Sequence, residues 1–360
     1  MDGIDAALVR FGDSTLDMIA THQLDYPAEV RRQLLAERSN SALRYCNDVP
    51  ELHQRVGECF RDAANELLTD AGQDASSVAA VGSHGQTLRH EPNAIEPFSL
   101  QIGDPDVIAS GTGITTIADF RRDDIELGGQ GAPLAPAFHE WLFHHEKRTR
   151  VVLNIGGIAN ITVLPGEGAD TIGFDTGPGN TLLDAWHEKH RRDAFDHDGA
   201  WAASGAVDGE LLARLLADQY FAVEPPKSTG FEYFNLDWLS QAGTEDIQHA
   251  DVQATLCELT ARSIAAAIAA VAPGKVEVLV CGGGVHNAEL MRRLASAMPA
   301  TDIRSTASAG LDPDWVEAAA FAWLAMRRMQ ELSGNLPSVT GARRAAVLGT
   351  VHAANELRTP

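Results

Sequence analysis

One aspartate has neighbours whose types and spacing suit acid–base chemistry. Asp175 ends a short apolar run, and Gly177, Pro178 and Gly179 follow it. The glycines permit a tight turn and the proline stiffens it, while Asn180 stands where an amphipathic helix would begin. We therefore predict a strand, a turn and a helix, with the carboxylate at the strand end beside exposed backbone N–H groups. Such a position suits anion binding and catalysis.

Two glycine-rich turns after predicted strands offer backbone donors for phosphate. Their sequences are NIGGIAN at 154–160 and CGGGVHN at 281–287. Glycine lets N–H groups approach phosphate oxygens, and a helix beginning at Asn287 would add its positive end. The alternative is a purely structural turn, which is the more frequent role of glycine. Neither turn matches GxxxxGK[ST] or GxGxxG in the required setting, which disfavours a P-loop or an ordinary dinucleotide fold.

An arginine pair and a glutamate are further candidates. Arg121 and Arg122 follow the apolar run ITTIA, and their forked donors suit sugar or phosphate oxygens. The alternative for such a pair is a solvated surface loop. Asp312 and Pro313 predict the start of a helix, and Glu317 lies in its first turns. The alternative role for a carboxylate at this position is a favourable interaction with the helix dipole.

Polar residues on glycine-containing loops complete the candidate pocket. His84 and Gln86 lie in SHGQT, and Gln130 lies in GGQGAP. A zinc site built on the histidines is disfavoured, because no HExxH pattern occurs and His144 and His145 point in different directions on one helix. The sequence therefore predicts no protein-bound metal.

Composition limits the class of protein. The chain has 360 residues, 44% of them hydrophobic, which predicts two domains, and the 28 basic and 50 acidic residues give a net charge of −22. That charge disfavours nucleic acid and anionic lipid as partners. No apolar run approaches the roughly 20 residues of a membrane span. The four cysteines form no CxxC pair, which indicates reduced packing residues and a cytoplasmic protein.

The order of predicted elements indicates an α/β fold. A hairpin opens the chain, helices follow within 28–38 and 50–72, and strands lie at 78–82 and 114–118. The polar stretches SHGQTLRH and DFRRDD begin where those strands end. After a charged boundary at 146–150, the stretch 151–165 repeats the glycine-broken hairpin, and a long helix within 251–272 leads to a βαβ-type crossover. We expect an amino-terminal domain over 1–148 and a carboxy-terminal domain over 149–360.

Longer motifs in this order resemble one family, the anhydro-N-acetylmuramic acid kinases. They include GSHGQTLRH, ADFRRDDIELGGQGAPLAPAFH, LNIGGIANIT, GFDTGPGNTLLDAW, DGAWAASG, KSTG, YFNLDWL, VLVCGGGVHN and NLPSVTGA. The resemblance covers nearly the whole chain. It implies two ribonuclease-H-like domains of the actin, sugar-kinase and heat-shock ATPase type that flank a central cleft. Closure of the cleft around ligand would follow.

The same resemblance implies an activity and residue roles. The reaction, which depends on ATP and Mg²⁺, opens the 1,6-anhydro ring with water and phosphorylates O6, with Asp175 as the general base. Arg121, Arg122, His84, Gln86, Gln130 and Glu317 would bind the sugar. The nucleotide would bind Asp2, Gly3, Asp5, Gly156, Gly157, Asn160, Gly177, Gly179, Gly282, Gly283, Gly284 and Asn287. A cytoplasmic homodimer is also implied.

The sequence departs from the family pattern at two places. The family begins with a strand and the loop GLMSGTSLDG, whereas this sequence begins MDGID, so that only Asp2, Gly3 and Asp5 match the end of that loop. Either the start codon was assigned too far downstream, or the protein lacks one of the family's phosphate-binding loops. Phe231 stands where the family usually has arginine. A related sugar kinase and a non-catalytic sugar- or nucleotide-binding protein are the alternatives.

Overall fold

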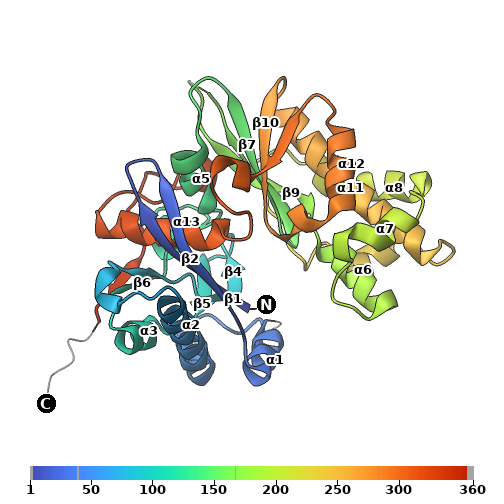
Figure 1. Cartoon of the computed structure of the whole chain (residues 1–360). Coiled ribbons are helices and arrows are strands. Elements are labelled where there is room, and N and C mark those ends of the chain that lie inside the picture. Colours follow the sequence, from blue (N-terminus) through green and yellow to red (C-terminus); the bar gives the residue numbers. More distant parts are fainter. Residues whose placement is uncertain (1–2, 39, 167, 355–360) are drawn as a thin grey trace, which may run out of the picture. The chain divides into compact units, whose positions relative to one another are not determined.

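The computed structural model describes residues 3–38, 40–166 and 168–354 (Figure 1). The chain forms two compact units, unit 1 with residues 1–142 and 317–360, and unit 2 with residues 143–316. The predicted boundary after 148 lies close to the observed one after 142, but the assignment of the last residues differs, because 317–360 return to unit 1. Strand β12 (Thr350–His352) pairs with β6 (Thr116–Ala118), and Trp323 packs on Phe138, both within unit 1.

Unit 2 contains a five-stranded sheet. Its strand order is β11-β10-β7-β8-β9, in which β7, β8 and β9 form an antiparallel meander while β10 and β11 run parallel to β7. The predicted hairpin at 151–165 and the predicted crossover are confirmed. The strands are β7 (Thr149–Ile155), β8 (Ile158–Leu164), β9 (Ile172–Pro178), β10 (Val276–Cys281) and β11 (Asp302–Ser305).

Helix α11 (His249–Val271) lies at the centre of the unit 2 core. Its residues Leu256 and Ile264 are buried with Val151 and Leu153 of β7. Among the described residues, it is the one helix that is long and apolar enough to cross a membrane. The sequence analysis did not identify such a segment. More than half of its apolar stretch is buried inside the protein, as in the core helix of a globular unit. The other helices are α6 (Thr181–Arg191), α7 (Ala200–Ser204), α8 (Gly209–Leu216), α9 (Gln219–Ala222), α10 (Leu236–Ser240) and α12 (Ala288–Ala297).

Unit 1 has its strands in three separate groups. The predicted opening hairpin is confirmed as β1 (Gly3–Phe11) and β2 (Leu16–Asp25). Strand β3 (Val81–Gly82) runs parallel to β6. The stretch SHGQTLRH, expected as a polar loop, instead leads into strand β4 (Gln86–Glu91), which pairs with β5 (Phe98–Ile102) and buries Leu88 in the core.

The predicted helices of unit 1 are confirmed. Helix α2 (Pro50–Asp70) is amphipathic and buries Leu52, Val56 and Leu67. The remaining helices are α1 (Ala28–Glu37), α3 (Pro105–Thr112), α4 (Arg122–Glu126), α5 (Ala135–Phe143), α13 (Val316–Met329) and α14 (Pro337–Thr340). Short 3₁₀ turns lie at Cys46–Asp48, Ala75–Ser77, His197–Gly199, Gly283–His286 and Thr306–Ala309.

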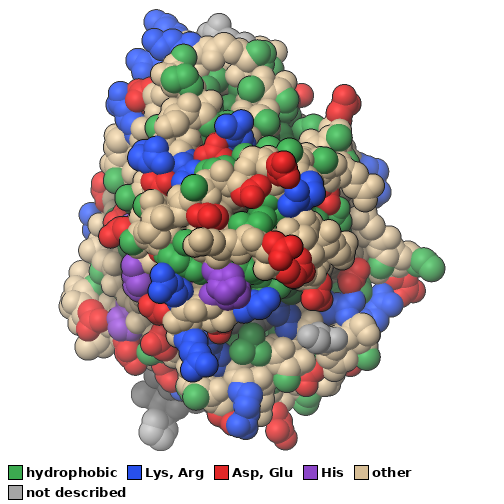
Figure 2. Space-filling view, turned by 90° about the vertical axis from the view of Figure 1, so that its right-hand side faces the viewer, with side chains coloured by type: hydrophobic (Ala, Val, Ile, Leu, Met, Phe, Trp, Pro, Cys, Tyr) green, Lys and Arg blue, Asp and Glu red, His purple; other side chains and the backbone are tan. Residues whose placement is uncertain are grey.

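The cysteines and the charged side chains agree with the composition. All four cysteines are free, and three of them are buried. On the face shown in Figure 2, acidic and basic side chains are interspersed over the described residues. Many arginines form ion pairs with nearby carboxylates, as Arg150 does with Glu277 at 2.7 Å between Nε and Oε2.

Candidate functional site

Asp175 is held in unit 2 by contacts on one carboxylate oxygen. Ser228 Oγ donates to Oδ2 at 2.9 Å, and the Thr229 backbone N–H donates to the same oxygen at 3.0 Å. The backbone is fixed as well, because Tyr220 Oη donates to the Asp175 carbonyl at 2.7 Å and the Asp175 N–H donates to the Lys227 carbonyl at 3.2 Å. Within residues 3–38, 40–166 and 168–354, no donor contacts Oδ1. One oxygen therefore orients the carboxylate while the other can accept a proton.

The surroundings of Asp175 tune its basicity. Its side chain is half-buried at the middle of β9. Burial raises the pKa of the Asp175 carboxyl above its ordinary value, and the hydrogen bonds from Thr229 and Ser228 oppose that rise. A raised pKa makes the carboxylate a stronger base than an exposed aspartate, as general-base catalysis requires.

Three polar residues form a row across the unit 2 sheet. Asn154 of β7 lies opposite Asn160 of β8, and Asn160 lies opposite Asp175 of β9. Directly opposed residues in antiparallel strands share one face of the sheet. All three are half-buried in strands whose other residues are mostly buried. Sequence analysis selected Asn160 and Asp175 but missed Asn154, although an asparagine on each side of the IGGIA turn was the available signal.

The two glycines of the β7–β8 turn have open surroundings. A Cβ on Gly156 or Gly157 would meet no heavy atom closer than 3.6 Å. Their carbonyls are occupied, since Gly179 N–H donates to Gly157 O at 2.9 Å and Asn180 N–H donates to Gly156 O at 2.8 Å. In the described part of the chain, the Gly156 and Gly157 N–H groups have no backbone acceptor. This turn can therefore offer donors to an anion.

The backbone N–H groups of the turn after Asp175 are not exposed as predicted. The N–H groups of Gly179 and Asn180, expected to be exposed, bond the β7–β8 turn. A Cβ on Gly179 would lie 2.3 Å from Gly156 O, and one on Gly177 would lie 2.8 Å from Phe221. Both glycines permit close packing. Helix α6 begins after Asn180 as predicted, but the Asn180 side chain does not cap it and donates instead to Ile155 O at 3.4 Å.

The three glycines after β10 differ in the space around them: Gly282 and Gly284 pack closely against other atoms, and Gly283 does not. A Cβ on Gly282 would lie 2.3 Å from Asn154 Oδ1, and one on Gly284 would lie 2.3 Å from Ile155 Cγ2. Gly283 has nothing within 4 Å of that position. Its N–H begins a 3₁₀ turn and has no backbone acceptor among the described residues. Gly283 is thus the one of the three where a ligand has room to approach.

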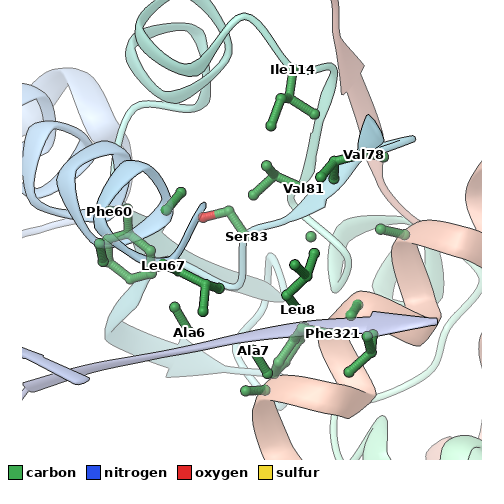
Figure 3. A pocket seen from close by; sticks show the side chains of 18 of the residues that line it. Ala6, Ala7, Leu8, Phe60, Leu67, Val78, Val81, Ser83, Ile114 and Phe321 are labelled. Atoms are coloured by element: carbon green, nitrogen blue, oxygen red, sulfur yellow. The ribbon is translucent and has the colours of Figure 1, made fainter. Parts of the chain in front are cut away.

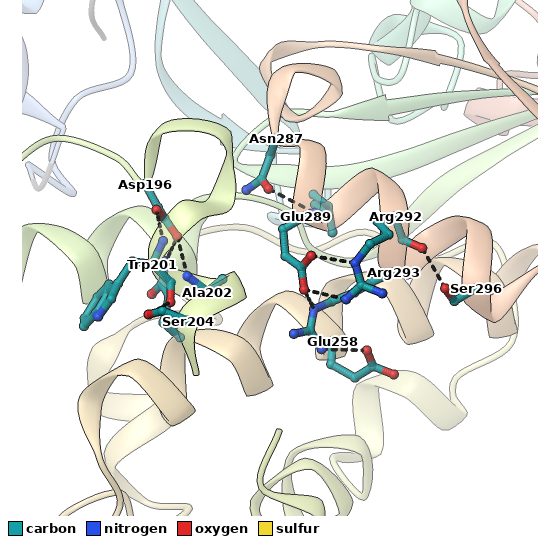
Figure 4. A network of polar contacts seen from close by, with 12 residues as sticks. Asp196, Trp201, Ala202, Ser204, Glu258, Asn287, Glu289, Arg292, Arg293 and Ser296 are labelled. Carbon is teal, nitrogen blue, oxygen red and sulfur yellow. Dashed lines mark hydrogen bonds and ion pairs between the residues drawn. The ribbon is translucent and has the colours of Figure 1, made fainter. Parts of the chain in front are cut away.

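Asn287 is occupied as a helix cap. Its Oδ1 accepts from the Leu290 N–H at 3.0 Å at the start of α12 (Figure 4). Farther along α12, Arg293 forms ion pairs with Glu289 at 2.8 Å and with Glu258 of α11 at 3.1 Å. These contacts fix α12 on α11 and thereby fix the orientation of the Gly283 turn that precedes it.

In unit 1 the structure brings Arg121 and His84 together. Arg121 Nη2 lies 2.8 Å and Nε 3.2 Å from His84 Nε2, while Nη1 donates to the Gly131 carbonyl at 2.8 Å. His84 stacks on Phe321 with ring centroids 4.3 Å apart. Burial and the neighbouring Arg121 charge lower the pKa of His84, so the imidazole is neutral and accepts from arginine.

Of the other candidates of unit 1, Glu317 lies near enough to Arg121 for the arginine charge to oppose the rise that burial causes in the pKa of its carboxyl, whereas Arg122 and Gln86 contact other residues. Arg122 is exposed and pairs with Asp119, so the two arginines do not act together. Glu317 lies at the start of α13, on whose next turn Phe321 (Figure 3) stacks with His84. Gln86 begins β4, where its Oε1 accepts from Tyr26 Oη at 3.4 Å.

A buried aspartate that sequence analysis missed holds the loop of Gln130. Asp124 is fully buried, and its oxygens accept from Gly131 N–H at 2.8 Å and from Asn335 Nδ2 at 2.5 Å. Thr340 Oγ1 also donates to Asp124 at 2.6 Å, and its carbonyl accepts from the Gln130 N–H at 2.8 Å. The motif NLPSVTGA therefore fixes the GGQG loop, and Gly131 O in turn fixes Arg121.

The predicted phosphate residues at the amino end occupy a strand. Gly3 and Asp5 lie in β1 opposite Asp25 and Gln23, and Gln23 Nε2 donates to Asp5 Oδ1 at 3.0 Å. The resemblance placed these residues at the end of a phosphate-binding loop, whereas in the structure they lie in a strand that pairs with β2. Asp2 lies outside the described residues.

A protein-built metal centre is not found in the described segments, which contain no group of three His, Cys, Asp or Glu side chains that could hold an ion. Mg²⁺ is commonly held by substrate phosphates, water and one or two protein oxygens. Asp175 and the neighbouring amide of Asn160 offer such oxygens on one face of the sheet.

Comparisons with known proteins show the family of the chain. A family model described as anhydro-N-acetylmuramic acid kinase matches residues 1–354. The anhydro-N-acetylmuramic acid kinase of Shewanella loihica is 49% identical over 359 residues, 99% of this chain and 96% of the relative. The protein of that name from Xanthomonas axonopodis pv. citri is 50% identical over 357 residues, 98% and 95% of the two chains.

Solved structures also match over most of their length. The activator of 2-hydroxyisocaproyl-CoA dehydratase from Clostridium difficile is 11% identical, with 91% of this chain and 98% of that chain covered and a TM-score of 0.42. A ROK family glucokinase from Streptomyces griseus is 15% identical, with 88% and 98% covered and a TM-score of 0.35.

Proposed function

Because the chain belongs to the anhydro-N-acetylmuramic acid kinase family, we propose that it opens the 1,6-anhydro ring of anhydro-N-acetylmuramic acid with water and phosphorylates O6. The product is N-acetylmuramic acid 6-phosphate, a step of cell-wall recycling. The phosphoryl donor is ATP. The observation in the structure that supports this reaction most directly is the Asp175 carboxylate, which is oriented through Oδ2 and open at Oδ1.

Asp175 acts as the general base. Its Oδ1 takes a proton from the water whose oxygen bonds the anomeric carbon, and the bond from that carbon to O6 breaks. O6 then bonds the γ-phosphorus of ATP, and ADP leaves. Ser228 and Thr229 keep the carboxylate in one orientation, so the base is already aligned when water binds.

Backbone donors of unit 2 hold the nucleotide. The open N–H groups of Gly156, Gly157 and Gly283 bind phosphate oxygens, and Asn160 lies beside Asp175 on the same face of the sheet. Asp175 and Asn160 would offer oxygens to a Mg²⁺ ion bound with ATP, which would neutralise charge on the phosphates. Gly177, Gly179, Gly282 and Gly284 support these turns through close packing.

Sugar contacts come from unit 1. Arg121 is fixed by His84 and Gly131, which leaves its guanidinium oriented for sugar or phosphate oxygens. Gln86, Gln130, Arg122 and Glu317 are secondary contacts. We place the protein in the cytoplasm as a homodimer, in keeping with its free cysteines and with the family resemblance.

Substitution Asp175→Asn tests the proposal. We expect kcat to fall by about 10²–10⁴-fold, because the amide cannot accept the proton from water, while ATP and sugar affinity are retained. The measurements are ATP-dependent product formation by mass spectrometry and ligand binding by calorimetry. Ordinary N-acetylmuramic acid and other amino sugars serve as substrate controls.

Two outcomes would contradict the proposal. Turnover of an ordinary amino sugar with none of the anhydro sugar would indicate a related kinase. Binding without ATP-dependent turnover by the parent chain would indicate a non-catalytic protein.

A further inference from the structure

The segment that contacts Asp175 has little regular structure of its own. Residues 223–235 join α9 to α10, and none of them lies in a helix or a strand. We call this segment the 223–235 loop. Its residues Lys227, Ser228 and Thr229 make the hydrogen bonds that fix Asp175, whereas residues 223–226 and 231–232 are exposed. A loop with so little buried surface needs anchors elsewhere to keep one orientation.

One carboxylate binds the chain on both sides of this loop. Asp218 lies just before α9, and its Oδ1 accepts from the Tyr220 N–H at 2.8 Å. The same oxygen accepts from Tyr233 Oη at 2.8 Å, and Oδ2 accepts from Trp238 Nε1 at 2.8 Å. Tyr233 and Trp238 belong to the motif YFNLDWL. Asp218 therefore joins the chain before the loop to the chain at its end, through hydrogen bonds that the carboxylate charge strengthens.

Backbone hydrogen bonds connect the motif YFNLDWL to Thr229. The Tyr233 and Phe234 N–H groups both donate to the carbonyl of Gly230 at 3.1 Å, and Gly230 directly follows Thr229. Phe234 is fully buried, and its ring lies 5.4 Å from that of Tyr220 between centroids. A displacement of Tyr233 would therefore move the Thr229 N–H away from the carboxylate that it orients.

Tyr220 provides a second connection between Asp218 and Asp175. Its Oη donates to the Asp175 carbonyl at 2.7 Å. Its own carbonyl accepts from Lys227 Nζ at 3.1 Å, and the same Nζ lies 4.7 Å from the centre of its ring. Asp218 fixes the backbone N–H of this tyrosine. Both connections from Asp218 thus end at Asp175, one at its backbone and one at its carboxylate.

We propose that Asp218 is a positioning residue for the Asp175 carboxylate. It holds α9 and the motif YFNLDWL together and so keeps Ser228 and Thr229 where they orient Oδ2. This inference rests on the proposed role of Asp175 as general base, whose alignment with water sets the rate of ring opening. The β7–β8 turn is held by the β9–α6 turn instead, so nucleotide binding does not depend on Asp218.

Substitution Asp218→Asn tests the inference. An amide has one acceptor oxygen, so it cannot accept on both sides as the carboxylate does, and at least one donor loses its partner. We expect kcat for the anhydro sugar to fall about 10-fold to 100-fold, while KM for ATP and for the sugar changes by less than about twofold. Hydrogen exchange of residues 227–234 should become about tenfold faster, with exchange in β7 and β10 unchanged.

Two further variants complete the test. Asp208→Asn is the matched control, because Asp208 is also half-buried and caps a helix of unit 2, accepting from the Leu211 N–H at 2.8 Å at the start of α8. It should equal the parent in kcat and in exchange of residues 227–234. Trp238→Phe keeps an aromatic ring and removes one donor to Asp218, so kcat should fall about three- to tenfold with KM unchanged. Added to Asp218→Asn, it should lower kcat little further, because both changes break the same hydrogen bond.

A parent-like kcat in Asp218→Asn and Trp238→Phe would overturn the inference. Weaker binding of both substrates in proportion to kcat, or faster exchange throughout unit 2, would also overturn it, because Asp218 would then have a general structural role. Absence of turnover in the parent chain would instead contradict the proposed chemistry. Exchange of residues 227–234 would in that case still decide whether Asp218 holds the 223–235 loop.

Discussion

At the scale of single residues, the Asp175 carboxylate is fixed through one oxygen. Ser228 and Thr229 both donate to Oδ2, so the geometry separates the oriented oxygen from the one that can receive a proton. Burial and hydrogen bonding act on the Asp175 pKa in opposite directions. The KSTG loop therefore contributes to the basicity of a residue far from it in sequence.

Substitution Ser228→Ala should move the acid limb of the kcat/KM profile to higher pH. Asp175 must be ionised to act as base, and the Ser228 hydrogen bond lowers its pKa, so removing that bond raises the pKa further. Initial rates across pH measure the shift. Ser240→Ala is the control, because this hydroxyl donates to the exposed Asp237 carbonyl at 2.8 Å. An acid limb unchanged in Ser228→Ala would contradict the proposed tuning.

At the scale of elements, the turns around the unit 2 sheet interlock. The β9–α6 turn uses its N–H groups to bind the carbonyls of the β7–β8 turn, which leaves the N–H groups of the latter open. Glycines with similar sequence surroundings therefore have different roles. Gly179 lies against backbone, whereas Gly283 lies against open space.

The substitutions Gly179→Ala and Gly283→Ala should separate these roles. In Gly179→Ala the new Cβ lies 2.3 Å from Gly156 O, and we expect a loss of about 1–3 kcal/mol in the free energy of unfolding. Gly283→Ala should remain within about 0.5 kcal/mol of the parent. It should raise KM for ATP about tenfold, because the new Cβ occupies the open space through which a phosphate oxygen approaches the N–H and so weakens a hydrogen bond of roughly 1.5 kcal/mol.

Urea unfolding and initial rates measure the two effects. Equal stability of both variants would contradict the packing role of Gly179. An unchanged KM in Gly283→Ala would remove this turn from the proposed nucleotide site.

At the scale of the whole molecule, the first unit is made from both ends of the chain. Residues 317–360 supply α13, β12 and the Asn335 contact to Asp124. Unit 2 is continuous in sequence and has its own core around α11. The continuous unit should therefore be separable, whereas unit 1 requires both segments.

We expect residues 143–316, expressed alone, to unfold cooperatively in urea. Residues 149–360, the division expected from sequence, should aggregate or bind a hydrophobic dye, because α13 would expose Phe321 and Trp323. Circular dichroism and dye fluorescence compare the two. Cooperative folding of 149–360 without dye binding, together with failure of 143–316, would contradict the observed division.

The net charge of −22 predicts a dependence of stability on salt. Repulsion among excess carboxylates destabilises the compact state, and salt screens it. Raising NaCl from about 0.05 M to about 0.5 M should raise the thermal midpoint by about 2–4 °C. An uncharged osmolyte at equal osmolality is the control. A midpoint that falls with NaCl would show that specific ion pairs outweigh the net repulsion.

The sequence by itself determined the elements with strong local patterns and the residues that carry the family resemblance. Helix α2, helix α11 and both hairpins were predictable, because hydrophobic periodicity and glycine turns act over neighbouring residues. Asp175 was identifiable because its turn residues are adjacent to it in the chain.

Only the tertiary structure decided which distant residues meet. The return of 317–360 to unit 1, the Arg121–His84 contact and the Ser228 bond to Asp175 join positions far apart in the chain. The row of Asn154, Asn160 and Asp175 depends on strand register, and a shift by one residue would turn each side chain to the other face. Packing of the whole chain sets such register and contacts, because residues distant in sequence have no local pattern that pairs them.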